Sequence, residues 1–292
     1  MQPFAEARAV KEVFAEASEV LKQDLWKLVV DGPAEELNST VNTQPVMLTA
    51  GYAVYRAWRD AGGPEPAVVA GHSLGEYTAL VAAGALAFRD ALPLVRFRAQ
   101  AMQEAVPAGE GAMAAILGLD DDAVRSACRE AAQGQVVEAV NFNAPSQVVI
   151  AGHKTAVERG AAAAKSMGAK RAVMLPVSAP FHSSLLKPAA DRLAARLEAI
   201  QVSAPRIPVV NNVDVAVESE PSRIKAALAR QACNPVRWVE VVRQISGQGI
   251  VHVAECGPGK VLAGMTKRID DKLQGHAITD GQSLGQVMAV VK

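Results

Sequence analysis

Ser73 occupies a position that is typical of a serine nucleophile. It has glycine two residues before and two residues after, in the run G-H-S-L-G at 71–75, and those two glycines make room for the sharp turn of a nucleophile elbow. A short apolar run precedes the turn, and an alanine-rich segment with helical periodicity follows it. We therefore expect the Ser73 hydroxyl at a helix N-terminus, where the Leu74 N–H can stabilise an oxyanion. An ordinary helix-capping serine is the alternative interpretation.

A serine nucleophile requires a general base, and His182 is the best placed of the five histidines. It lies in the loop at 177–183, directly after a predicted small subdomain, and loops held by rigid elements often carry catalytic groups. His72 adjoins Ser73, but side chains diverge at such a turn, so we expect a structural or electrostatic role for it. Asp191 and Glu255 are weak candidates for the carboxylate of a triad, and a backbone carbonyl could orient the imidazole instead. The other histidines fall in a strand end, an apolar strand and the C-terminal tail: His153, His252 and His276.

Arg98 is a charged residue within an apolar helical stripe. Its neighbours three and four positions away are Leu94, Val95, Ala101 and Met102. A guanidinium in such surroundings needs an anionic partner, and its planar fork suits a carboxylate. A structural salt bridge or a side chain that extends to solvent is the alternative. If the partner is a ligand, the substrate carries a carboxylate.

The periodicity of apolar residues predicts the elements that position these side chains. One amphipathic helix should run from residue 10 to about 31, and a second from 43 to about 61. The segment 109–176 has the order β-α-β-β-α-β, which predicts a ferredoxin-like subdomain inserted into a larger α/β body formed by 1–108 and 177–292. The tail at 275–292 has no clear pattern. The six elements of the insert are expected at 112–117, 120–132, 136–140, 147–151, 155–167 and 171–175.

Composition restricts the class of protein. The 292 residues carry 30 basic and 30 acidic side chains, so we expect neither a nucleic-acid partner nor an anionic membrane surface as partner. No apolar run approaches the roughly 18 residues of a membrane helix, and the N-terminus does not resemble a signal peptide. Three widely spaced cysteines indicate neither a disulfide framework nor a zinc site. A monomer in the reducing cytoplasm is expected.

Several motifs in the same order together resemble the malonyl-CoA:acyl carrier protein transacylase family of fatty acid biosynthesis. The resemblance runs from about Phe14 to Ile269. It implies an α/β-hydrolase-like body with a parallel sheet and a ferredoxin-like insert, and an acyltransferase that moves a malonyl group from malonyl-CoA to the phosphopantetheine thiol of acyl carrier protein. No metal or redox cofactor is implied. The motifs are FAEAS, GPAEELN, TQP, AGHSLGEY, RFRAQAMQEAVP, NFNAPSQVVIAG, PFHSSLLKPAA, NPVRW and ECGPGKVLAGMTKRI.

The resemblance also implies roles for individual residues. Ser73 matches the acylated serine, His182 the base, and Arg98 the arginine that holds the malonyl carboxylate. Gln231 matches the residue whose main-chain carbonyl orients the histidine, and Phe181 resembles malonyl-selective relatives. The positions that line the site are matched by Gln44, Asn143 and Leu74, and His72 is placed with them.

One departure from the family leaves alternatives open. The family opens with a strand and a Gly-Gln-Gly-Ser-Gln loop that supplies a second oxyanion donor, and this chain starts after that loop. We expect Met1 to be an internal methionine of a longer ancestor. Loss of one oxyanion donor typically lowers the rate about a hundredfold or more. A serine hydrolase or thioesterase, and an inactive remnant that binds carrier protein, are therefore the alternative functions.

Overall fold

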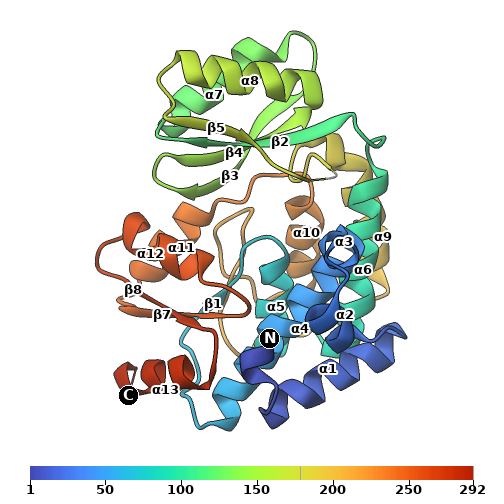
Figure 1. Cartoon of the computed structure of the whole chain (residues 1–292), viewed down its shortest axis with the longest axis vertical. Coiled ribbons are helices and arrows are strands. Elements are labelled where there is room, and N and C mark those ends of the chain that lie inside the picture. Colours follow the sequence, from blue (N-terminus) through green and yellow to red (C-terminus); the bar gives the residue numbers. More distant parts are fainter. Residues whose placement is uncertain (178, 292) are drawn as a thin grey trace.

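The chain folds into an α/β body and a smaller unit that contains a four-stranded sheet, at one end of the long axis (Figure 1). This computed structural model describes residues 1–177 and 179–291. Ser178, in the predicted loop before His182, and Lys292, at the end of the tail, lie outside the described residues. The predicted fold class is confirmed, whereas the domain boundaries at 108/109 and 176/177 stay a prediction.

The first predicted helix is in fact two helices. α1 (Arg8–Leu21) ends where Lys22 adopts a left-handed conformation with φ of 52°. Asp24 then starts α2 (Leu25–Asp31) by accepting a hydrogen bond from the N–H of Lys27. The periodicity continues across this break because both helices bury apolar faces in the same core, so the prediction of a single helix was wrong.

The body contains two pairs of parallel strands. β1 (Val69–Ala70) pairs with β6 (Val209–Val210), and β7 (His252–Cys256) pairs with β8 (Gln274–Ile278). β8 and α13 (Gly281–Val290) account for the tail to which the sequence assigned no structure. The other helices of the body are α3 (Ala34–Asn38), α4 (Thr40–Asp60), α5 (Leu74–Ala82), α6 (Phe88–Glu104), α9 (Lys187–Glu198), α10 (Pro221–Gln231), α11 (Trp238–Ser246) and α12 (Val261–Ile269).

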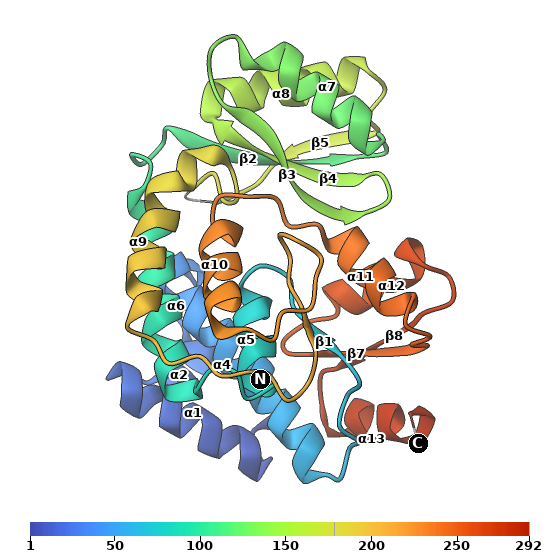
Figure 2. The same cartoon turned by 180° about the vertical axis from the view of Figure 1, so that it is seen from behind.

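The smaller unit has the predicted β-α-β-β-α-β order. Its strands are antiparallel to their neighbours in the spatial order β3-β4-β2-β5. Its two helices cover the face turned away from the body, as both views show (Figures 1 and 2). A separate apolar core lies between these helices and the sheet. The elements are β2 (Gly111–Leu117), α7 (Asp121–Ala132), β3 (Val137–Ala144), β4 (Gln147–His153), α8 (Lys154–Ser166) and β5 (Arg171–Met174).

A backbone contact joins the two units close to the elbow. The N–H of Val236 donates to the carbonyl of Val140 at 2.8 Å, and the N–H of Phe142 donates to the carbonyl of Val236 at 3.0 Å. The chain between α10 and α11 therefore lies against β3. Because α10 ends just before this contact and packs beside α9 (Figure 2), the C-terminal end of α10 is brought toward the elbow.

Candidate active site

The turn between β1 and α5 is a nucleophile elbow. Ser73 has φ of 52° and ψ of −106°, a conformation that L-residues rarely adopt and that the surrounding structure must hold in place. A Cβ atom added to Gly71 would lie 2.0 Å from the main chain of Gly75, so only glycine fits at position 71. A Cβ on Gly75 would meet no heavy atom of the described residues within 4 Å. The expectation that both glycines are needed for space therefore holds only for Gly71.

Ser73 and His182 lie in hydrogen-bond contact, although they are far apart in sequence. The distance from Ser73 Oγ to His182 Nε2 is 2.7 Å, and His182 Nδ1 lies 2.8 Å from the main-chain carbonyl of Gln231. A carbonyl only accepts, so Nδ1 carries the proton in the neutral ring, and Nε2 is left to accept from the serine hydroxyl. Burial and then the nearby Arg98 charge lower the pKa of His182 to about 3. The imidazole is thus neutral and able to act as a base at neutral pH.

Arg98 is a buried cation with neutral hydrogen-bond partners. Only 2% of its surface is exposed. Its Nη1 donates to Gln44 Oε1 at 2.7 Å, and its Nη2 donates to Ser73 Oγ at 3.0 Å and to Gln231 Oε1 at 2.9 Å. Within residues 1–177 and 179–291, no carboxylate forms an ion pair with it, and burial lowers its pKa. A guanidinium in this state favours an anionic ligand beside Ser73.

Residues on both sides of the elbow complete the site. His72 points away from Ser73, as predicted, and its Nε2 lies 2.8 Å from Asn143 Oδ1 on β3. Burial lowers the pKa of His72. Leu74 is the first residue of α5, which places its N–H at the helix N-terminus. Phe181 packs against apolar residues of both the body and the small sheet, directly before His182. All nine candidate residues therefore lie at or beside the elbow, whereas their catalytic roles stay predictions.

Two residues that sequence reasoning missed hold the elbow. Asn212 Oδ1 accepts from the N–H of Ser73 at 2.7 Å, and Asn212 Nδ2 donates to the carbonyl of Gly71 at 2.9 Å. Glu76 is 2% exposed and accepts from the N–H of Asn212 and from Gln231 Nε2. Glu76 carried a usable signal, because it is a charged residue in an otherwise apolar helical segment, as Arg98 is. No local signal distinguishes Asn212.

Among residues 1–177 and 179–291, no group of three or more His, Cys, Asp and Glu side chains could hold a metal ion. None of the helices found there combines the length and apolar character that crossing a membrane requires. The expectation that the reaction needs no metal or cofactor stays a prediction.

The chain is similar to known proteins over nearly its whole length. The acyl transferase domain family matches residues 1–277. Malonyl CoA-acyl carrier protein transacylase of Escherichia coli strain K12 is 57% identical over 279 residues, which cover 96% of this chain and 90% of the relative. The crystal structure of acyl-carrier-protein S-malonyltransferase from Burkholderia pseudomallei 1710b is 65% identical with a TM-score of 0.98, covering 99% of this chain and 94% of that one. A type II PKS acyl-carrier protein in complex with its malonyl-transacylase matches at 53% identity with a TM-score of 0.96, covering 98% of this chain and 93% of that one.

Proposed function

The chain belongs to the acyl transferase domain family, and on that premise we propose that it transfers a malonyl group from malonyl-CoA to the thiol of acyl carrier protein through an ester of Ser73. The observation that carries this proposal is that His182 and Arg98 both lie within hydrogen-bond distance of the Ser73 hydroxyl oxygen. The homologues named for this activity support the same substrate and acceptor.

In the first half-reaction, the Ser73 oxygen attacks the thioester carbon of malonyl-CoA. His182 Nε2 takes the serine proton as the carbon–oxygen bond forms, and the Nδ1–H bond to the Gln231 carbonyl stabilises the resulting imidazolium. The Leu74 N–H lies at the N-terminus of α5, where it can donate to the developing oxyanion. The carbon–sulfur bond then breaks, and His182 returns the proton to the CoA sulfur as the thiol leaves.

In the second half-reaction, the phosphopantetheine thiol of acyl carrier protein attacks the ester of Ser73. His182 takes the thiol proton and passes it to the Ser73 oxygen as the ester bond breaks, so the enzyme returns to its starting state. Each half-reaction uses the same serine and the same base. The expected kinetics are ping-pong, with a malonyl-enzyme that persists when the acceptor is withheld.

Arg98 gives the site its selectivity in this proposal. Its guanidinium donates to three neutral oxygens, two of them on the carboxamides of Gln44 and Gln231. The free carboxylate of a malonyl group would supply the anion that this buried cation lacks, whereas an acetyl group would not. Phe181 and Asn143 are proposed to line the acyl pocket.

We also propose that the enzyme acts as a monomer in the cytoplasm, without a nucleic-acid or membrane partner. The balance of 30 basic and 30 acidic residues supports the absence of a strongly charged partner surface. The three cysteines are unpaired, as a reducing compartment requires.

The test is a two-stage labelling experiment on the purified protein. Incubation with malonyl-CoA should add one malonyl group, detected by intact-protein mass spectrometry, and acyl carrier protein added afterwards should remove it as malonyl-carrier. Ser73→Ala should not be labelled. Release of free malonate at the same rate without carrier protein would favour a hydrolase, and carrier binding without any labelling would favour an inactive remnant.

A further inference from the structure

We propose that Glu76 is a positioning residue for acyl transfer, because one of its carboxylate oxygens holds both residues that fix the Ser73 main chain and the His182 ring. Glu76 Oε2 accepts from the N–H of Asn212 at 2.9 Å and from Gln231 Nε2 at 3.0 Å. This inference rests on the proposed function, since it names a further residue on which the attack by Ser73 depends.

One set of hydrogen bonds connects Glu76 to the elbow through Asn212 and Gln231. Asn212, whose N–H is bound by Glu76, binds the N–H of Ser73 and the carbonyl of Gly71 with its side chain. Gln231 Nε2 donates to the carbonyl of Ser73 at 3.0 Å as well as to Glu76. The peptide groups on both sides of Ser73 are therefore held by partners of Glu76. A residue with φ of 52° keeps that conformation only when its surroundings determine it.

A second set of hydrogen bonds connects Glu76, through Gln231, to the base His182 and to the cation Arg98. Gln231 binds His182 Nδ1 through its main-chain carbonyl and binds Arg98 Nη2 through Oε1. Because Nε2 of the same carboxamide is bound by Glu76, the orientation of the amide is determined: Oε1 faces Arg98 and Nε2 faces Glu76. A substitution of Glu76 would therefore alter the positions of the nucleophile Ser73, the base His182 and the cation Arg98 together.

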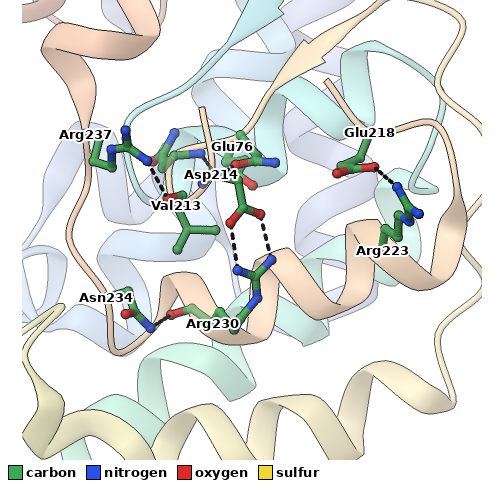
Figure 3. Close-up of polar contacts among 10 residues, drawn as sticks. Glu76, Val213, Asp214, Glu218, Arg223, Arg230, Asn234 and Arg237 are labelled. Carbon is green, nitrogen blue, oxygen red and sulfur yellow. Dashed lines mark hydrogen bonds and ion pairs between the residues drawn. The ribbon is translucent and has the colours of Figure 1, made fainter. Parts of the chain in front are cut away.

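The charged groups around Glu76 leave it without a direct ion pair in the described part of the chain. On the side of the active site, the Gln231 amide separates it from Arg98. On the other side, Asp214 is bound by the guanidinium of Arg230 at 2.7 and 2.6 Å, as Figure 3 shows.

Other titratable groups near Glu76 are also engaged or neutral. Glu218, which lines a cavity of about 10 Å³ beside Glu76, lies 3.8 Å from Arg223. Tyr77 follows Glu76 on α5, and burial raises its pKa to about 12, so it stays neutral. The site also contains the histidines His182 and His72, and burial lowers the pKa of both.

Glu76 changes charge in a range where His182 does not. Burial raises the pKa of Glu76 to about 7, although its bonds to Gln231 and Asn212 and the Arg98 charge act in the opposite direction. The pKa of His182 is about 3. The ionised carboxylate is the stronger acceptor for two N–H donors, so protonation of Glu76 weakens both bonds. The loss of nucleophile reactivity between about pH 8 and pH 5.5 should therefore follow Glu76 and not the imidazole.

The test compares wild type with Glu76→Gln and Glu76→Ala, and uses a fluorophosphonate probe that reacts with serine nucleophiles and needs no acyl-CoA. The wild-type labelling rate should fall as the pH drops through about 7 and then level off near the rate of Glu76→Gln, because a protonated carboxyl still has a neutral oxygen that accepts weakly. In Glu76→Gln, whose amide oxygen still accepts but does not titrate, the rate should be independent of pH down to about pH 5.5 and within about fivefold of wild type at pH 8. Glu76→Ala should lower the rate at pH 8 by about a hundredfold.

The matched control is Glu218→Gln, which removes a carboxylate from the same cavity, although Glu218 forms no hydrogen bond to Gln231 or Asn212 in the described part of the chain. It should keep the wild-type pH profile. If the labelling rate of Glu76→Gln still falls below about pH 7 as that of wild type does, the proposal is wrong. This result tests the proposal even if Glu76→Ala fails to fold. A wild type that reacts with the probe but gains no malonyl group would refute the proposed function and leave the role of Glu76 intact.

Discussion

At the scale of single residues, the site brings together ionisable groups that are costly to bury. Arg98 and Glu76 lie on opposite sides of the Gln231 carboxamide, which accepts from the cation and donates to the carboxylate. Neither group contacts an opposite charge directly in the described residues. Buried groups of this kind destabilise the fold unless they are well bonded. Their retention is best explained by the substrate and the nucleophile that they serve.

Substitution of Arg98 should lower the rate of malonyl transfer much more than the rate of acetyl transfer. In Arg98→Ala, the rate of malonyl-enzyme formation should fall by about a hundredfold, because a charged hydrogen-bonded pair with the substrate carboxylate is worth about 3 kcal/mol. Acetyl-enzyme formation from acetyl-CoA should change much less. Rapid-quench measurement with both thioesters gives the two rates. Equal losses for both substrates would indicate that the arginine is structural.

Arg96 provides the matched control for this experiment. It lies on the same helix, donates to the carbonyl of Leu21 at 3.2 Å and contacts the side chain of Gln23. Because these partners lie at the end of α1 and in the segment between α1 and α2, Arg96→Ala should lower stability without changing the ratio of malonyl to acetyl rates.

At the scale of the element, the turn between β1 and α5 must be held in one conformation for Ser73 to face His182. β1 is two residues long and pairs only over Val69–Val209 and Ala70–Val210 in the described chain. Side-chain bonds of Asn212 and Gln231 to the main chain of the turn add further restraint. The contact between β3 and Val236 brings Asn143 to His72 and so adds the small unit to the same site.

The two glycines of the elbow should respond differently to alanine. Gly71→Ala should destabilise the protein by more than about 3 kcal/mol or prevent its folding, because the new methyl group would overlap the main chain of Gly75. Gly75→Ala should change stability by less than about 1 kcal/mol, since its methyl group would meet open space and alanine favours a helix. Urea unfolding followed by circular dichroism measures both. Similar effects at the two positions would contradict the geometry of the turn.

At the scale of the whole molecule, the buried carboxylate of Glu76 links stability to pH. Its pKa is about 7 in the folded protein, against 4.5 for the free side chain. The folded state therefore binds more protons than the unfolded state between these values. The stability that this group contributes is fully present below about pH 4.5 and is lost as the pH rises through 7. The buried neutral His182 acts in the opposite direction, because its lowered pKa makes stability rise with pH between about 3 and 6.5.

The difference between wild type and Glu76→Gln isolates the carboxylate, because the other groups are common to both proteins. The free energy of unfolding of Glu76→Gln minus that of wild type should be larger at pH 8 than at pH 5, by at most about 3 kcal/mol. Urea unfolding of both proteins at the two pH values measures this difference. A stability difference that does not change with pH would show that Glu76 does not titrate over this range.

Much of the fold could be predicted because it depends on local patterns. The β-α-β-β-α-β order of the small unit follows from alternating periodicities, and its elements begin and end within a few residues of the predicted bounds. The break between α1 and α2 was missed, since apolar positions continue across it. The pairing of β8 with β7 was also missed, because strand pairing depends on packing and not on the strand's own pattern.

The sequence by itself determined which groups could do the chemistry. Ser73 between its glycines, His182 in a loop and Arg98 in an apolar stripe are all visible within a few residues of chain. Only the tertiary structure decided how these groups are held. Glu76 binds partners that lie 136 and 155 positions away in the chain, Asn212 and Gln231. Contacts over such separations arise from the packing of whole elements, so no local pattern could specify that one buried carboxylate oxygen supports the elbow and the base together.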